Sequence, residues 1–279
     1  MQIREYLQWY SLILFFNLVI NILVMLKKSL ARYYNYDEDR FMSQSDLFNS
    51  DSVCIFTDAS FKESPNCKSG TSIGTTAPAY CVYFNNSCIE QDFHILHGST
   101  SQQGELYAML LGIRASYRYR NWCKYIRIFS DSQNTVFAIR DRMVNWASST
   151  NEGIKILGSD GSIKNQNYLM MIVNEIMSNN IPLILYHVKG HVNIKNDSSI
   201  TSARQTFRQS NPFVKKIDDN TIYKIAMGNN AVDEYSTVML RSNIDNPRYK
   251  ISRTSKREIS VEYYKFDINR YSELINYKG

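Results

Sequence analysis

Runs of apolar residues alternate with polar, turn-forming segments through the middle of this chain. Short runs rich in β-branched and aromatic residues predict strands, and longer stretches with apolar residues at helical spacing predict helices. The strands are expected over about 52–57, 79–84, 88–94, 125–129 and 184–188, and the helices over about 105–117, from just after 131 to about 139, and over about 167–177. A leading meander of strands, followed by strands that alternate with helices, predicts an α/β fold with a mixed sheet.

The N-terminal segment has a different pattern, because residues 7–26 contain no charged residue. About 20 apolar residues can span a bilayer, and the positive charges of Lys27 and Lys28 that follow would place the rest of the chain on the cytoplasmic side. On a helical wheel, however, Asn17 and Asn21 fall on one stripe, which also suits a soluble helix packed on one side. Both interpretations, a membrane anchor and a soluble helix, stay open at this point.

The composition indicates a globular protein with a basic surface. Hydrophobic residues make up 44% of the 279 residues, and the formal net charge of +6 suits a polyanionic partner such as nucleic acid. The five cysteines are scattered and none forms a Cys-x-x-Cys pair, which argues against a zinc site and indicates reduced thiols. We therefore expect the protein in the cytoplasm or another reducing compartment, and on the cytoplasmic side of a membrane if residues 7–26 form an anchor.

Four carboxylates stand beside the predicted elements. Asp58 and Asp131 each end an apolar run, Glu105 opens a predicted helix, and Asp233 lies where a late helix is expected to start. Each has an ordinary interpretation as a turn, cap or helix-dipole residue. Carboxylates at the ends of buried strands, however, cost several kcal/mol each unless they are paired or bind a metal. Converging carboxylates suit Mg²⁺, and two such ions can bind both sides of a phosphodiester under attack.

The segments around these carboxylates resemble motifs of the ribonuclease HI family. Thr57-Asp58-Ala59-Ser60 is similar to the first-strand motif, although that family usually has glycine where this chain has Ala59. The other similar segments, in the expected order, are 100–106, 130–133, 187–191 and 229–234. The resemblance covers roughly residues 51–240. It implies an RNase H-like fold, in which a mixed five-stranded sheet is flanked by helices.

The resemblance also implies a function. The protein would be an endoribonuclease that hydrolyses the RNA strand of RNA–DNA hybrids and leaves 5′-phosphate and 3′-hydroxyl ends. The expected catalytic set is Asp58, Glu105, Asp131, His191 and Asp233. Its four carboxylates would hold two Mg²⁺ ions, for which Mn²⁺ can substitute, and the histidine would transfer protons. Four polar residues match the positions that contact the hybrid in the family: Ser101, Gln102, Gln133 and Asn165.

Three regions are expected along the chain. A hydrophobic N-terminal helix and linker occupy 1–50, an RNase H-like catalytic domain occupies 51–240, and a basic and aromatic extension occupies 241–279. Residues 192–227 depart from the resemblance, because the family has only a short loop between the histidine and the last aspartate. Their many serine, asparagine, threonine and basic residues predict an insertion or a flexible flap.

Two alternative functions are compatible with the same residues. One is another nuclease of the RNase H-like superfamily, of the transposase or resolvase type. The other is a non-catalytic RNase H-like scaffold that binds nucleic acid or a protein partner. The order of the four carboxylates and the segment His187-Val188-Lys189-Gly190-His191 favour ribonuclease H over both. The sequence identifies no particular protein partner.

Overall fold

The computed structural model describes residues 52–65, 72–121, 123, 125–150, 153–158, 161–178, 183–214 and 216–244. The hydrophobic segment 7–26 and the extension beyond residue 244 lie outside these residues, so the anchor and tail interpretations stay predictions. Among the helices that are described, none is long and apolar enough to cross a membrane.

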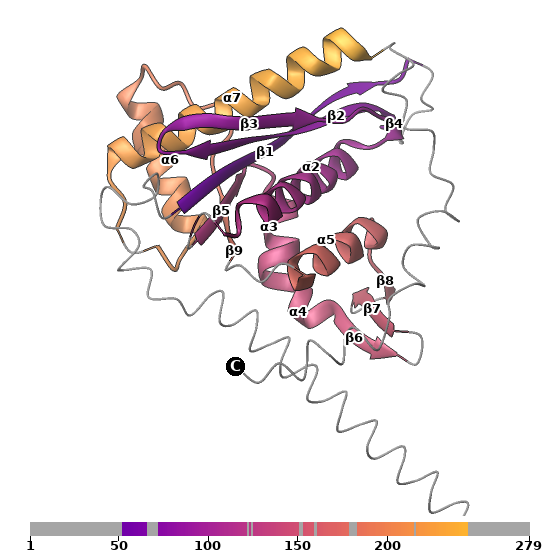
Figure 1. Cartoon of the computed structure of the whole chain (residues 1–279). Helices are drawn as coiled ribbons and strands as arrows, with labels where there is room; N and C mark the ends of the chain where they lie inside the picture. The colour runs from indigo at the N-terminus through magenta and orange to yellow at the C-terminus, as the bar shows by residue number, and fades with distance from the viewer. Residues whose placement is uncertain are drawn as a thin grey trace, which may run out of the picture.

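A mixed β-sheet forms the centre of the fold, as the sequence predicts (Figure 1). Its strands follow the order β3-β2-β1-β5-β9, with antiparallel pairing among the first three and parallel pairing of β1 with β5 and of β5 with β9. The bounds are β1 (Ser52–Glu63), β2 (Gly74–Phe84), β3 (Ser87–Phe93), β5 (Tyr125–Ser130) and β9 (Leu183–His187). A short sixth strand, β4 (Leu96–Ser99), pairs with β2 and was not predicted.

The strands expected over about 79–84 and 88–94 form a hairpin as β2 and β3. Its turn places Asn85 and Asn86 at φ values of 49° and 65°. Asparagine tolerates this left-handed conformation better than most residues, and two such residues in a row match the twist of a tight hairpin.

Helices cover both faces of the sheet. One face carries α2 (Ser101–Ser116), α3 (Gln133–Phe137), the π-helical turn η3 (Ala138–Arg142), α4 (Met143–Trp146) and α5 (Gln166–Ser178). The other face carries α6 (Asp197–Ser210) and α7 (Asp219–Asn243). A short 3-10 turn, η2 (Tyr117–Tyr119), follows α2, and a small antiparallel sheet of β6 (Ala147–Thr150), β7 (Gly153–Gly158) and β8 (Gly161–Ser162) was not predicted.

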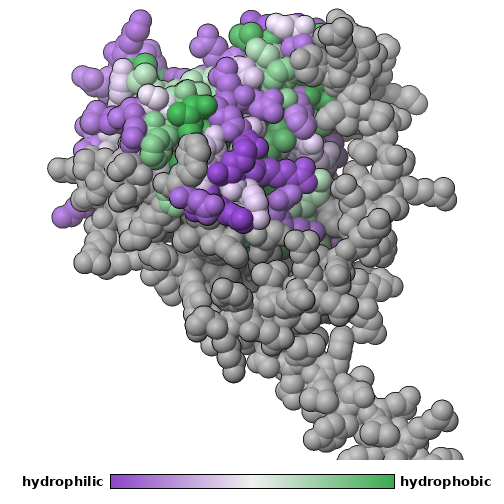
Figure 2. Space-filling view, in the orientation of Figure 1, coloured by the Kyte–Doolittle hydropathy of each residue, from purple (hydrophilic) through white to green (hydrophobic). Residues whose placement is uncertain are grey.

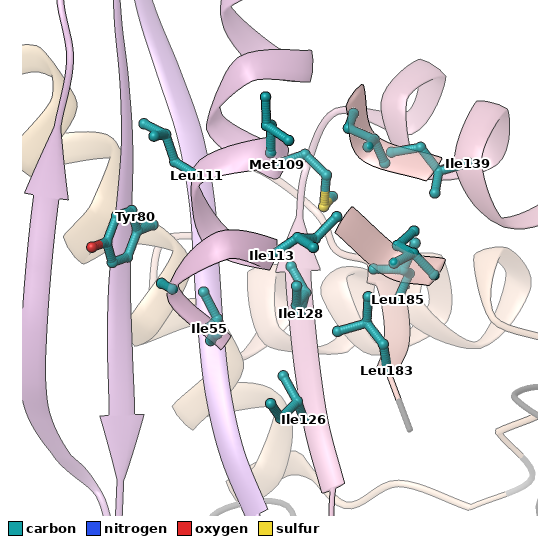
Figure 3. Close-up of a cluster of buried hydrophobic side chains, with 14 of the residues drawn as sticks. Ile55, Tyr80, Met109, Leu111, Ile113, Ile126, Ile128, Ile139, Leu183 and Leu185 are labelled. Atoms are coloured by element: carbon teal, nitrogen blue, oxygen red, sulfur yellow. The ribbon is translucent and has the colours of Figure 1, made fainter. Parts of the chain in front are cut away.

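The apolar run in β1 explains why both faces need a cover. Successive residues of a strand point to opposite faces. Val53 and Ile55 therefore enter the cluster beneath α2 and α5, which Figure 3 shows together with residues of β5 and β9. Cys54 and Phe56 enter the cluster beneath α6 and α7. Burial of each such large side chain stabilises the fold by about 1.5–3 kcal/mol.

The prediction of a flexible flap over 192–227 is wrong. The segment contains α6 and the first turns of α7, and both pack on the sheet. Ile200, Ala203 and Phe207 are all buried, and their spacing of three and four residues places them on one face of α6. The polar residues between these three positions obscured the helical pattern in the sequence.

Six large apolar side chains are exposed on the described surface. On the face seen in Figure 2, polar and apolar side chains are interspersed. Three of the exposed large apolar side chains, Tyr223, Met227 and Val238, lie on α7, and the other three are Ile73, Ile89 and Tyr117.

Candidate active site

Asp58 lies within β1 rather than at its end, because β1 continues to Glu63 along its antiparallel partner β2. The parallel pairing with β5 stops earlier, at Thr57 and Ser130. Beyond that point β5 ends and leaves one side of β1 open. Asp58 is the first residue beside this opening, and Asp131 is the first residue after β5.

Glu105 lies in the second turn of α2 and does not open the helix as predicted. The helix begins at Ser101, and Thr100 caps it in a reciprocal pair of hydrogen bonds with Gln103. Gly104 lets this end of α2 come close to the sheet, since a Cβ atom there would lie 2.9 Å from the side chain of Thr76 and 3.1 Å from the Cβ of Ala59. That approach carries the glutamate to the opening beside Asp58.

Two hydrogen bonds hold Asp131, and the loop after β9 passes close to its carboxylate. The Asn229 amide on α7 donates to Asp131 Oδ2 at 3.3 Å, and the His187 ring nitrogen Nε2 lies 3.2 Å from the Asp131 backbone oxygen. His187 is therefore packed and hydrogen-bonded. Gly190 allows the loop after β9 to pass the carboxylate closely, because a Cβ atom at this position would lie 2.4 Å from Asp131 Oδ2.

Asp58, Glu105 and Asp131 together form a compact carboxylate centre. One oxygen from each lies within 4.8 Å of the other two. Within the described part of the chain, none of the three forms an ion pair with a lysine or arginine. Glu105 Oε2 is buried without a hydrogen-bond partner. Three crowded carboxylates with an unpartnered buried oxygen match the ligand set of a hard divalent cation such as Mg²⁺.

The environment opposes ionisation of all three groups. Burial, then the nearby Asp131 and Asp233, raises the pKa of Asp58 to about 7. Burial and the neighbouring carboxylates hold the pKa of Glu105 well above its usual value. Burial also raises the pKa of Asp131, although the Asn229 hydrogen bond and His191 act in the opposite direction. A bound cation would reverse these shifts by favouring the ionised forms.

Asp233 and His191 form a separate pair at the side of this centre. Asp233 lies in the middle of α7 and not at a helix start, because Asp218 caps the helix much earlier. Its carboxylate is outside the group of three oxygens within 4.8 Å, and its Oδ2 lies 3.1 Å from His191 Nδ1. The His191 side chain is 80% exposed, which leaves the imidazole open to solvent.

Two residues outside the expected catalytic set hold the carboxylates in place, and one of them, Asn229, lies in the motif segment 229–234 without having been assigned a role. Asn229 contacts Asp131, and the Ser236 hydroxyl lies within hydrogen-bonding distance of Asp58 Oδ2, at 3.2 Å. Both are on α7 with Asp233, and the spacing 229, 233, 236 places the three on one helical face. Helical spacing counted from Asp233 would have identified them, had the whole segment been predicted as helix.

The predicted hybrid-binding residues are distributed over three helix starts. Ser101 is exposed and Gln102 is half-buried in the first turn of α2, and Gln133 is exposed at the start of α3. The Gln102 amide donates to Thr135 Oγ1 at 3.2 Å, which joins the first turn of α2 to α3. Asn165 precedes α5 with a φ of 61°, and no hydrogen bond that the structure describes connects its side chain to the other three.

We expect Asp58 to make the stability of the metal-free protein pH-dependent. The folded-state pKa of Asp58, about 7, exceeds its ordinary value. Its contribution to the free energy of unfolding is therefore full below about pH 4 and is lost as pH rises through 7. Mg²⁺ should therefore raise the melting temperature more at pH 8 than at pH 5. Asp58→Asn should remove most of this difference. Thermal unfolding in EDTA and in Mg²⁺ at pH 5 and pH 8 measures this change in melting temperature. An equal change at both pH values would contradict the assignment of Asp58 to the metal site.

Comparison with known proteins adds independent findings. A family model described as RNase H matches residues 50–207, which is more than half of the chain. The matched range includes Asp58, Glu105, Asp131 and His191 and ends before Asp233. No curated protein matches the chain.

The solved structures that the chain matches include several RNase H proteins. The solution structure of the PFV RNase H domain is 14% identical, has a TM-score of 0.41, and is matched over 58% of this chain and 96% of that chain. LC11-RNase H1, isolated from compost by a metagenomic approach, is 11% identical with a TM-score of 0.37, over 56% of this chain and 97% of that chain. The foamy viral protease-reverse transcriptase in complex with RNA/DNA hybrid is 15% identical with a TM-score of 0.42. That match covers 60% of this chain but only 21% of the viral chain.

Proposed function

The chain belongs to the RNase H family, and we propose that it hydrolyses the RNA strand of RNA–DNA hybrids at the centre formed by Asp58, Glu105 and Asp131. The observation that carries the proposal is the meeting of these three carboxylates within 4.8 Å at the open side of β1. Ribonuclease H is a hydrolase of phosphodiester bonds. The hydrolysis would depend on bound metal ions and leave 5′-phosphate and 3′-hydroxyl ends.

The chain's own residues have distinct parts in this mechanism. Asp58, Glu105 and Asp131 would hold two Mg²⁺ ions, with Asp233 as a further ligand beside them. Bound there, the metal ions would supply a nucleophilic water and stabilise the negative charge on the scissile phosphate. Asn229 and Ser236 orient the carboxylate oxygens of Asp131 and Asp58 through their hydrogen bonds. Oriented ligands preserve the geometry that an in-line displacement needs.

His191 is the candidate for proton transfer. Its imidazole is exposed to solvent and lies beside Asp233, which can orient the ring. A histidine in this position can carry a proton between the reacting groups and bulk water.

Substrate choice requires contact with the 2′-hydroxyl groups of one strand, because this group distinguishes RNA from DNA. Ser101, Gln102 and Gln133 supply polar side chains at the adjoining starts of α2 and α3. Asn165 is the fourth candidate. We propose that these residues bind the hybrid next to the carboxylate centre.

A cleavage assay on four duplexes tests the proposed substrate. Full-length protein is incubated with RNA–DNA, RNA–RNA, DNA–DNA and a DNA duplex that contains isolated ribonucleotides, each in Mg²⁺ and in EDTA. We expect Mg²⁺-dependent cleavage of the RNA strand of RNA–DNA alone, with 5′-phosphate and 3′-hydroxyl ends. Cleavage of DNA–DNA would instead favour a transposase-like or resolvase-like nuclease.

We expect His191→Ala to lower kcat on the hybrid by roughly 10²-fold or less, because a proton-transfer group assists a reaction that the metal centre can still perform. The Mg²⁺ concentration for half-maximal activity should barely change. Added imidazole should restore part of the rate, since the side chain is 80% exposed and leaves an accessible space. Complete loss of activity would show that His191 is a metal ligand or a structural residue instead.

A further inference from the structure

Helix α6 is firmly attached to the free edge of the sheet. Asn211, which follows α6, donates to the backbone oxygen of His187 at 2.8 Å and accepts from its backbone nitrogen at 3.0 Å. The amide thus pairs with the edge strand β9 as a neighbouring strand would. Arg140 from η3 donates to Ser210 O at 2.7 Å and to Asn211 Oδ1 at 2.8 Å. The ring of Phe207 also stacks on Tyr186, with centroids 5.7 Å apart.

The other end of α6 contacts the loop that carries His191. Lys189, two residues before the histidine, donates from Nζ to Ser202 Oγ at 2.7 Å. Asn193, two residues after it, donates from its backbone nitrogen to Ser199 Oγ at 3.0 Å. Two serines one helical turn apart on α6 therefore hold the loop on both sides of His191.

His191 depends on such support from its loop. Its φ of 51° lies in the left-handed region, which costs free energy for any residue with a side chain unless the surrounding structure imposes it. Its side chain is largely exposed, so packing does not hold the ring in place. The backbone on either side must therefore set the position of the imidazole beside Asp233.

We propose that α6 is a positioning element for His191, and that Ser199 and Ser202 act as positioning residues. They hold the loop so that the imidazole lies next to Asp233 when the proton is transferred. The inference rests on the proposed function and adds to it a role for the segment between the histidine and the last aspartate. It predicts an effect on the proton-transfer step and none on hybrid binding.

The test combines Ser199→Ala and Ser202→Ala in the full-length protein. Alanine favours helices more than serine, so α6 should persist. With two hydrogen bonds to the loop lost, kcat on the RNA–DNA hybrid should fall roughly 5- to 10-fold while KM is unchanged. Ser202→Thr, which keeps a hydroxyl, should retain most of the rate in an otherwise unchanged protein. Thr201→Ala is the matched control, because Thr201 is exposed on the same turn of α6.

A double-mutant cycle with His191→Ala separates positioning from general support of the fold. If the serines act through the histidine, their removal should not lower kcat further once His191 is alanine. An equal loss in both backgrounds, or an unchanged kcat in the serine variant, would overturn the inference. Failure of the proposed function is distinguishable, because the unmodified protein would then not cleave the hybrid at all.

Discussion

Asp58→Asn should abolish hydrolysis of the hybrid, lowering kcat at least about 10³-fold. The amide has nearly the same shape as the carboxylate but no charge, so it cannot hold a divalent cation in the same way. Removal of a buried charge next to Glu105 and Asp131 also relieves repulsion, so the metal-free variant should melt no lower than the unmodified protein at pH 8. Cleavage rates in Mg²⁺ and thermal unfolding in EDTA measure the two effects.

Glu63→Gln is the matched control for this prediction. Glu63 lies on the same strand and is exposed at its end, away from the carboxylate centre. The same chemical change there should leave cleavage almost unaffected. Near-normal turnover by Asp58→Asn, in protein that binds the hybrid normally, would show that the three carboxylates are not the catalytic centre.

Arg140→Met should give the largest loss of stability, about 3 kcal/mol or more. The Arg140 side chain is buried, with 4% relative exposure, and donates to Leu185 O, Ser210 O and Asn211 Oδ1. The methionine side chain matches much of the length of arginine but donates no hydrogen bond. The backbone oxygens of Leu185 and Ser210 would therefore each lose a donor. The attachment of α6 to β9 would weaken at the same time. Chemical denaturation gives the change in the free energy of unfolding.

Arg142→Met controls for the loss of a positive charge in the same turn. Arg142 is exposed on η3, and surface substitutions of this kind usually change stability by less than about 0.5 kcal/mol. If Arg140→Met were as stable as Arg142→Met, the hydrogen bonds of Arg140 would not contribute to the fold, and α6 would need another anchor.

Local patterns in the sequence predicted most of the sheet and the helices on one of its faces. Apolar runs identified β1, β5 and β9, because each signal lies within a few neighbouring residues. The boundaries were less accurate. β1 extends six residues beyond the predicted end at 57. Its later residues are held in the strand by pairing with β2, although the apolar run that marks the strand in the sequence has already ended.

Elements that depend on contacts between distant segments were not predicted. Helix α6 was predicted as a flap because only three apolar residues mark its buried face. These residues become buried only by packing on Tyr186 and the edge strand β9, which are distant in the sequence. The support of Asp131 by Asn229 and of Asp58 by Ser236 was missed for the same reason, since α7 was expected to begin near Asp233.

The sequence by itself determined most strands of the central sheet and the helices on one of its faces, and it identified the four carboxylates of the candidate site, because short motifs and local periodicity are properties of neighbouring residues. Only the tertiary structure decided that Asp58, Glu105 and Asp131 each place an oxygen within 4.8 Å of the other two. It also decided that Asp233 pairs with His191 beside them. Such distances depend on where β5 ends, how closely Gly104 lets α2 approach, and how α6 and α7 pack on the sheet. These depend on packing between segments far apart in the chain, which no local pattern contains.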